Sequence, residues 1–136
     1  MENILELQQV SKTFPKSNFA LENVTFSLPY GSILGFVGEN GAGKTTTIGC
    51  ILNTIAKDSG TVKLFGKEMT DADTDMREKI GVVYDGDNFP TYWTAAQLAK
   101  VMAGFYKQWD NILFQKFLKE YKLPANQKIK QYSRGM

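Results

Sequence analysis

The sequence has 136 residues, 43% of them hydrophobic, a length and composition typical of one globular domain or part of one. The formal net charge of +2 comes with no basic face, which argues against nucleic-acid binding, and no apolar run approaches the roughly 20 residues of a membrane-spanning helix. The single cysteine excludes a disulfide within the chain and favours a reducing compartment, and the absence of histidine excludes any mechanism that needs a histidine side chain.

Strand patterns dominate the first part of the chain. Apolar alternation predicts strands over residues 4–10 and 20–28, and the Pro-Tyr-Gly sequence at 29–31 predicts a turn. The short apolar run 33–37 is typical of a buried strand in a parallel sheet.

The next stretch, residues 38–45, is the most informative because Gly38, Gly43, Lys44 and Thr45 fit the phosphate-binding pattern G-x-x-x-x-G-K-[ST]. Four fixed positions match by chance in a chain of this length less than roughly 2% of the time. Glycines let the backbone approach phosphates closely, so that its N–H groups form an anion nest. Lys44 is then expected to reach the β- and γ-phosphates, and the Thr45 hydroxyl to ligate Mg²⁺. We therefore predict a nucleotide phosphate site.

A helix is predicted directly after this loop, with one apolar face made of Ile48, Ile51, Leu52 and Ile55. Cys50 lies within it, which favours a packed thiol over a reactive one. Further along, residues 61–65 and 80–84 are predicted strands, and the acidic stretch 71–75 is expected to open a short helix.

Beyond residue 85 the pattern becomes helical. Thr94 and Gln97 form a predicted capping box, and Asp110 is expected to cap a second helix. The apolar stripes of the two helices are interpreted as core and comprise Ala95, Leu98, Ala99, Met102, Phe105 and Tyr106 in the first, and Phe114, Phe117, Leu118 and Tyr121 in the second. We predict a nucleotide-binding α/β part over residues 1–87 and a helical subdomain over 88–136.

Taken together, these features resemble the N-terminal half of the nucleotide-binding domain of an ABC transporter ATPase subunit. The resemblance is carried by the phosphate loop, by Val10-Ser11-Lys12-Thr13-Phe14, by residues 20–26 followed by Gly31, and by Asp58-Ser59-Gly60 with Gly66. It implies an α/β fold with an incomplete P-loop NTPase core of ABC type, an antiparallel β portion and the start of a helical subdomain. It also implies ATP and Mg²⁺ as cofactors, with ATP contacted by Phe14, Ala20, Gly38, Asn40, Gly41, Ala42, Gly43, Lys44, Thr45 and Thr46. Phe14 is the expected aromatic beneath the base, although an ordinary core role for it stays open.

Two positions depart from the family pattern. Asp85 stands where the family usually has a glutamine that contacts Mg²⁺ and the attacking water; a carboxylate can ligate Mg²⁺ but adds negative charge near the γ-phosphate. The signature segment reads Tyr132-Ser133-Arg134-Gly135-Met136, with Arg134 in place of a glycine. Ser133 and Gly135 match the residues that cap the γ-phosphate of ATP bound to the other subunit, and the segment resembles drug- and antibiotic-exporter subunits.

The resemblance also implies what lies outside these residues. The family's Mg²⁺-binding aspartate, catalytic glutamate and switch histidine would follow Met136, so we expect a fragment of a longer subunit that binds nucleotide without turning it over. The 33–37 strand would then present an unpaired apolar edge. Two other readings remain open: a regulatory module that binds ATP without turnover, and a non-transport ABC ATPase.

The expected partners are a second ATPase subunit, in a head-to-tail dimer, and a transmembrane permease subunit. The aromatic segment 89–93 is where we expect contact with the permease, although it can equally cap the helical subdomain. The resemblance implies a cytoplasmic protein held at the inner face of the cell membrane through the permease, with export as the expected direction of transport and no nucleic-acid partner.

Overall fold

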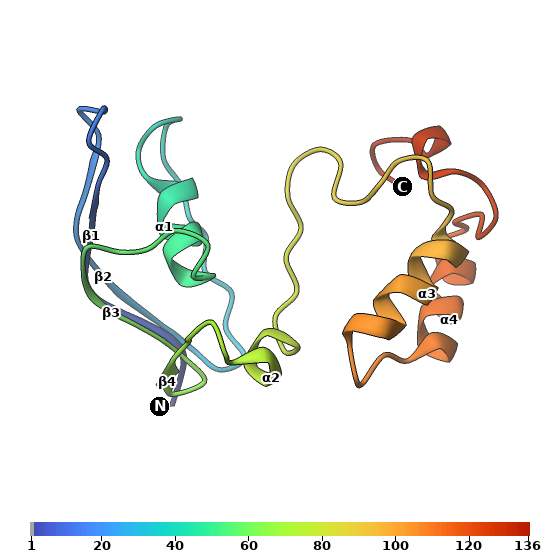
Figure 1. The fold of residues 1–136 in the computed structure, drawn as a ribbon, viewed down its shortest axis with the longest axis horizontal. Coiled ribbons are helices and arrows are strands. Elements are labelled where there is room, and N and C mark those ends of the chain that lie inside the picture. The colour runs from blue at the N-terminus through green and yellow to red at the C-terminus, as the bar shows by residue number, and fades with distance from the viewer. Residues whose placement is uncertain (1) are drawn as a thin grey trace. The chain divides into compact units, whose positions relative to one another are not determined.

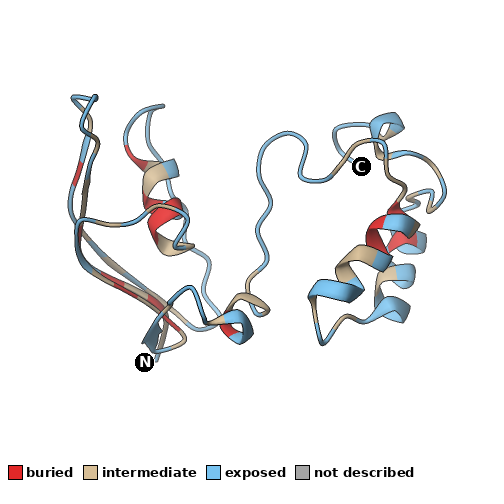
Figure 2. Ribbon diagram, viewed as in Figure 1, coloured by how far each residue is buried: buried red, intermediate tan, exposed pale blue. Residues whose placement is uncertain are grey.

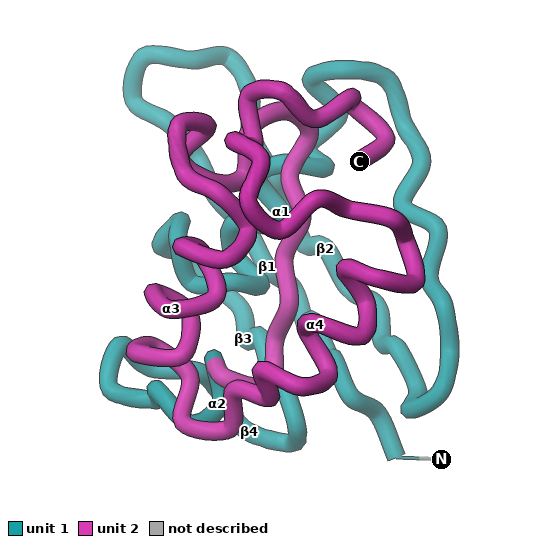
Figure 3. Tube along the Cα trace, turned by 90° about the vertical axis from the view of Figure 1, so that its right-hand side faces the viewer, with its two compact units in different colours: residues 1–77 teal, residues 78–136 magenta. Residues whose placement is uncertain are grey.

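The structure of the chain is a computed structural model that describes residues 2–136 (Figure 1). The chain divides into two compact units, Met1–Arg77 and Glu78–Met136, which Figure 3 colours separately. Each unit has its own buried residues (Figure 2). Among the described residues, no helix combines the length and the apolar character needed to cross a bilayer.

The first unit is built on an antiparallel sheet. It contains β1 (Asn3–Thr13), β2 (Ala20–Pro29), β3 (Ser59–Leu64) and β4 (Lys67–Glu68), in the spatial order β2-β1-β3-β4. The central strand β1 places Leu7 opposite Phe26 of β2 and Val62 of β3. The predicted strands at 4–10, 20–28 and 61–65 and the expected antiparallel β portion are therefore confirmed.

An irregularity in β1 keeps its apolar residues on one face. Leu5 and Leu7 alternate as in a regular strand, but the next buried residue is Val10, three positions further on. The register shifts between Leu7 and Val10, and Gln9 has a positive φ of 50°. Because an inserted residue in one strand restores the facing of those after it, Val10 points to the same side as Leu7.

The helix after the phosphate loop, α1 (Lys44–Ile51), is shorter than its apolar pattern predicts. It buries Thr47, Gly49 and Cys50, whereas Ile48 on the predicted face is 42% exposed. The chain folds back after α1, so that the backbone N–H groups of Thr54 and Ile55 donate to the Gly49 carbonyl at 2.9 and 3.1 Å. Ile55 thus reaches α1 from a turn and not from a further helical turn. The prediction of one helical face carrying all four apolar residues is wrong.

The Cys50 thiol is packed, as predicted, with 5% of the residue exposed. Burial raises the pKa of this thiol above its ordinary value. A thiol that stays protonated is a poor nucleophile.

Two predicted strands are wrong, because residues 33–37 and 80–84 form no regular structure. Ile33 and Val37 are 100% and 97% exposed, and Val83 is 90% exposed. A strand needs a neighbour for its N–H and C=O groups, and no strand of the described chain pairs with either segment. Only Phe36 of the first segment has an aromatic partner, the ring of Phe26 in β2, at 5.7 Å between centroids. The exposed apolar character expected for 33–37 is present.

Polar anchors tie the remaining segments of this unit to the sheet. The Asp58 carboxylate accepts from the backbone N–H and the hydroxyl of Thr13 at 2.7 and 2.8 Å and from Lys12 Nζ at 3.3 Å, which lowers the pKa of Asp58. The expected short helix is α2 (Thr74–Arg77). Just before it, Asp73 accepts from Lys67 Nζ at 2.7 Å and from Thr70, which lowers the pKa of Asp73 to about 2.

The second unit contains α3 (Ala95–Phe105), α4 (Asn111–Glu120) and the 3₁₀ helix η1 (Ile129–Gln131). The predicted capping box is confirmed: the Gln97 N–H donates to Thr94 Oγ1 at 3.1 Å and the Thr94 N–H to Gln97 Oε1 at 2.9 Å. The Asp110 cap is confirmed by the Leu113 N–H, which donates to Asp110 Oδ1 at 2.8 Å.

The predicted stripes are only partly core. Buried members of α3 and α4 are Ala95, Leu98, Ala99 and Leu118, whereas Phe105, Phe117 and Tyr121 are 75%, 44% and 63% exposed. The α3 and α4 helices contact each other, and the Phe105 end of the α3 stripe lies largely outside this contact. The functional boundary between residues 87 and 88 stays a prediction.

Candidate functional site

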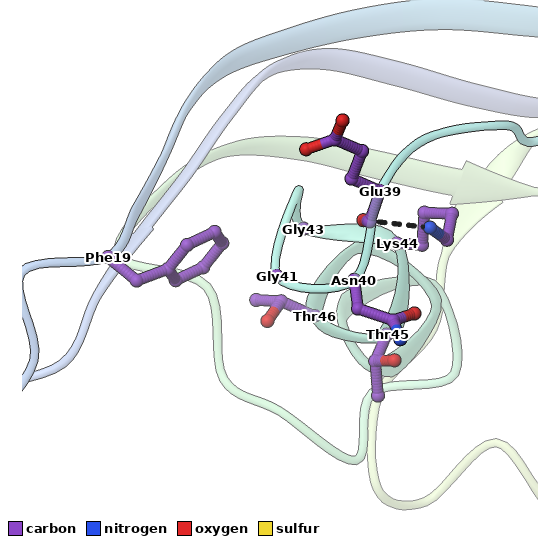
Figure 4. Close-up of a pocket in the computed structure, with 8 residues that line it drawn as sticks. All are labelled: Phe19, Glu39, Asn40, Gly41, Gly43, Lys44, Thr45 and Thr46. Atoms are coloured by element: carbon purple, nitrogen blue, oxygen red, sulfur yellow. Dashed lines mark hydrogen bonds between the residues drawn. The ribbon is translucent and has the colours of Figure 1, made fainter.

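A cavity of about 330 Å³ lies at the N-terminal end of α1 (Figure 4), a volume within the range of small-ligand pockets. Its lining comprises Phe19, Glu39, Asn40, Gly41, Gly43, Lys44, Thr45 and Thr46. Most of the predicted phosphate-loop residues are therefore brought together around one space. Four predicted contacts are absent from this lining: Phe14, Ala20, Gly38 and Ala42.

The backbone conformation of the loop depends on two glycines. Gly41 and Gly43 have φ values of +88° and +103°, a region that residues with a Cβ rarely adopt. The Ala42 N–H donates to the Glu39 carbonyl at 3.1 Å and closes the turn between them. The sequence folds in this way locally because glycine occurs at each position that needs a left-handed conformation.

The N-terminus of α1 carries no competing anion. Gly43 is its N-cap, provides no side-chain cap, and no acidic residue lies in the first turn. The first N–H groups of a helix have no partner within the helix, and the helix dipole adds a partial positive charge there. This end of the cavity therefore suits a phosphate group.

Lys44 turns back onto its own loop. Its Nζ donates to the carbonyls of Gly38 and Glu39, the second at 2.9 Å (Figure 4). No carboxylate among the described residues holds this ammonium group, so a bound anion competes for it only with two neutral carbonyl oxygens.

Three consecutive threonines follow Lys44, and they have two different environments. Thr45 and Thr46 line the cavity, whereas Thr47 is 1% exposed and its hydroxyl donates to the Gly43 carbonyl at 2.7 Å. Among the described residues, no group of three or more His, Cys, Asp or Glu side chains converges on a point that could hold a metal. Mg²⁺ usually keeps several waters and shares substrate phosphates, so the Thr45 hydroxyl fits a Mg²⁺ that arrives with a nucleotide.

The aromatic side chain in the cavity is Phe19, which the sequence analysis did not single out. A Cβ added to Gly43 would lie 3.2 Å from Phe19 Cζ, which places the ring directly against the phosphate loop. The Phe14 ring neighbours the Phe19 ring, with 6.3 Å between ring centroids and 35° between ring planes. The sequence does contain a signal for Phe19, because it is a second aromatic residue, after Phe14, in the loop between β1 and β2.

The two positions that depart from the family pattern contact each other within the second unit. Arg134 Nη2 donates to Asp85 Oδ1 at 2.7 Å, and the two side chains are 89% and 86% exposed. Ser133 and Gly135 lie in a turn after η1, where the Met136 N–H donates to Ser133 Oγ at 3.3 Å. Asp85 belongs to the second unit and Thr45 to the first, and the Mg²⁺ site expected from them stays a prediction.

Comparison with known proteins identifies the family. Residues 21–136 match the family model described as "ABC transporter". The Bacillus subtilis ABC transporter ATP-binding protein YtrB is 30% identical over 135 residues, which are 98% of this chain and 45% of YtrB. The Treponema denticola phosphonates import ATP-binding protein PhnC is 37% identical over 93 residues, which are 62% of this chain and 35% of PhnC.

The fold comparison points the same way. A solved ATP-binding subunit of an ABC transporter superposes with a TM-score of 0.82 at 24% identity, covering 98% of this chain and 57% of that one. At this identity the superposition shows the shared fold, that of the ABC-type P-loop NTPase. The chain spans about half the length of the relatives it matches. Because the family model covers most of the sequence, the chain belongs to the ABC transporter family and corresponds to part of its ATP-binding component.

Proposed function

We propose that the chain is the ATP-binding part of an ABC transporter ATPase, which couples ATP binding and hydrolysis to transport across a membrane. The observation that carries the proposal is the cavity at the start of α1, where Gly41 and Gly43 turn the backbone and Lys44 lies beside an uncapped helix end. A polyphosphate is the ligand that this combination of N–H groups, helix dipole and ammonium group favours.

In this proposal the loop residues 38–46 bind the phosphates. Lys44 leaves the Gly38 and Glu39 carbonyls and donates to the β- and γ-phosphates, since a phosphate oxygen is the stronger acceptor. The Thr45 hydroxyl, with Asp85 as the second proposed ligand, would hold Mg²⁺, which neutralises charge on the phosphates when bound. Phe14 and Ala20, beside the cavity-lining Phe19, remain proposed contacts at the nucleoside end.

The partners belong to the same proposal. Ser133 and Gly135 would contact ATP held by a second ATPase subunit in a head-to-tail dimer. Phe89 and Tyr92, 43% and 65% exposed, would contact a permease subunit and so hold the protein at the inner face of the membrane. The backbone of this segment is itself fixed, because the Lys130 N–H donates to the Thr91 carbonyl at 2.7 Å.

The direction of transport is left open in this proposal. Export was expected from the signature segment, but it gains no support from relatives such as PhnC, which is named as an import protein. The competing function is nucleotide binding without turnover. The absence of histidine and the lack of a converging acidic cluster among the described residues favour it for these 136 residues by themselves.

The test is a substitution of the loop lysine. Lys44→Ala is expected to abolish detectable Mg-ATP binding by calorimetry, whereas Lys116→Ala, an equal charge change on the exposed surface of α4, should bind as the parent chain does. Retained affinity in Lys44→Ala would overturn the phosphate-loop assignment. Phosphate release measured on the same samples separates turnover from binding alone.

A further inference from the structure

Within the second unit, the segment that follows Asp85 and the end of the chain run antiparallel (Figure 1). The Ile129 N–H donates to the Trp93 carbonyl at 2.8 Å, and the Lys130 N–H donates to the Thr91 carbonyl at 2.7 Å. We call these two hydrogen bonds the backbone clasp. Because the segments run in opposite directions, residues before 91 come opposite residues after 130, which brings two turns of the chain together.

The first of these turns, residues 84–88, carries Asp85 and is ordered by the side chain of Asn88. The Asn88 Oδ1 accepts from the Tyr84 N–H at 2.6 Å, and its Nδ2 donates to the carbonyls of Tyr84 and Gly86 at 2.9 and 3.0 Å. A side-chain amide that bonds several backbone groups of one turn restricts the conformation of that turn. Asp85 therefore projects from an ordered turn.

The second turn, residues 133–136, carries Arg134. The Met136 N–H closes it by donating to the Ser133 carbonyl at 3.1 Å and to Ser133 Oγ at 3.3 Å. Arg134 Nη2 reaches the first turn and donates to Asp85 Oδ1 at 2.7 Å. Among the described residues, no other hydrogen bond or ion pair joins the two turns, so this pair is the polar link between them.

We infer that the Asp85–Arg134 pair is a releasable latch, which holds the turn over residues 133–136 against the turn over residues 84–88 while the backbone clasp stays closed. Both residues depart from the family pattern, and the two departures compensate each other. A glycine at position 134 has no side chain to reach the first turn, and a glutamine at position 85 has no charge to attract a guanidinium group. The acid and the base therefore act as one unit.

The latch opens more readily than the clasp, because solvent reaches both of its ends. The Asp85 and Arg134 side chains are 86% and 89% exposed, and an exposed ion pair shifts an equilibrium by only about 1.5- to 5-fold. Salt screens such a pair, since the Debye length falls from about 10 Å at 0.1 M to about 3 Å at 1 M. Salt should therefore release the second turn and leave the clasp, which pairs uncharged backbone groups, closed.

The consequence of the latch rests on the proposed function. Ser133 and Gly135 lie in the latched turn, and they are the residues proposed to contact ATP held by a second subunit. A closed latch keeps this turn in one orientation before the contact forms, which lowers the ordering cost of binding. Arg134 is thus a positioning residue, which acts on this turn through its bond to Asp85.

The experiment measures amide hydrogen exchange by NMR on the unliganded 136-residue chain at one fixed pH. The Met136 N–H reports on the latched turn, and the Ile129 and Lys130 N–H groups report on the clasp. Because a bonded amide exchanges when its segment opens, its exchange rate follows the open fraction. In Asp85→Asn the Met136 rate is expected to rise by about 1.5- to 5-fold, with the two clasp rates unchanged.

Arg134→Gln should raise the Met136 rate by the same factor, after correction for the altered neighbouring side chain. Asp87→Asn is the matched control, because it removes the same charge from an exposed position in the same turn, and its Met136 rate should stay within about 1.2-fold of the parent value. The double variant Asp85→Arg with Arg134→Asp reverses both charges and keeps their attraction. Its rate should return to within about 1.5-fold of the parent value.

The latch is overturned if the Met136 rate stays at the parent value in both single variants. An equal rise at Ile129 and Lys130 would also overturn it, since the pair would then stabilise the whole clasp. A salt series on the parent chain needs no substitution: raising NaCl from about 0.05 to about 1 M should bring its Met136 rate to that of Asp85→Asn, and a rate that ignores salt refutes the latch. The proposed function fails separately, because these measurements need no nucleotide and a latched chain that does not bind Mg-ATP refutes only that function.

Discussion

The glycines of the phosphate loop give the sharpest quantitative prediction, because the structure places each under a different constraint. At Gly43, φ is +103° and an added Cβ would lie 3.0 Å from Leu21 Cδ1 and 3.2 Å from Phe19 Cζ. At Gly41, φ is +88° and no atom lies within 4 Å of an added Cβ. Gly38 does not adopt a positive φ, and its added Cβ would meet a side-chain methyl carbon at 3.3 Å.

These constraints convert into a ranking of alanine substitutions. A left-handed backbone costs a residue with a Cβ about 1–2 kcal/mol, and forcing a methyl group into an occupied space adds about 1–3 kcal/mol. Gly43→Ala, which carries both penalties, is therefore expected to disfavour the binding-competent loop by about 2–5 kcal/mol, or about 30-fold or more in affinity. Gly41→Ala carries only the backbone penalty, about 5- to 30-fold. Gly38→Ala is expected to change affinity least.

Calorimetric titration of each variant with Mg-ATP measures this ranking, and a circular-dichroism melt shows that the sheet is intact. Residues 38–42 are exposed, whereas Gly43 is buried beside Leu21 and Phe19. We therefore expect the strain of Gly41→Ala to appear in binding alone, and that of Gly43→Ala to appear both in binding and in a lower melting temperature. Equal losses for Gly41→Ala and Gly43→Ala would refute the contribution of the Leu21 and Phe19 contacts. A Gly38→Ala variant that is the most damaging of the three would refute the reasoning altogether.

Two further predictions concern polar pairs outside the cavity. Because hydrogen bonds from Lys67 and Thr70 lower the pKa of Asp73 to about 2 from 3.8, this carboxylate stabilises the fold above pH 3.8, and the contribution is lost as the pH falls through about 2. Urea unfolding at several acidic pH values should show Asp73→Asn losing less stability than the parent across that window; parallel losses would contradict the assignment. For the Asp85–Arg134 pair, whose side chains are 86% and 89% exposed, a double-mutant cycle with Asp85→Gln and Arg134→Gly should give a coupling below about 1 kcal/mol that shrinks in high salt. A coupling that salt does not change would show that solvent does not screen the pair.

The parts of the fold that the sequence predicts correctly depend on local chemistry. The capping box of Thr94 and Gln97 needs only residues three apart, and the β1 and β2 patterns are those of strands with one buried face. The loop glycines are equally local, since a positive φ is a property of one residue. For these features the amino-acid types are sufficient.

The two wrong strand predictions depend on a partner. Residues 33–37 and 80–84 have strand-like sequences, yet neither forms a ladder, because no strand of the described chain supplies the opposing N–H and C=O groups. The stripe of α3 that ends at Phe105 is likewise longer than the surface that covers it. A hydrophobic pattern indicates that a segment can be buried, but not which other segment buries it.

The sequence by itself therefore predicted a phosphate loop at residues 38–45, on which our proposed function rests, and a resemblance to ABC transporter ATPase subunits, which the family comparison confirms. Only the tertiary structure decided that Phe19 and not Phe14 lines the cavity, and that Asp85 and Arg134, 49 positions apart, form an ion pair. The physical reason is the range of the interactions. Backbone conformation and helix capping depend on residues close together in the sequence. The packing of an aromatic ring on a loop, or the pairing of two charges, depends on how the fold brings distant segments together.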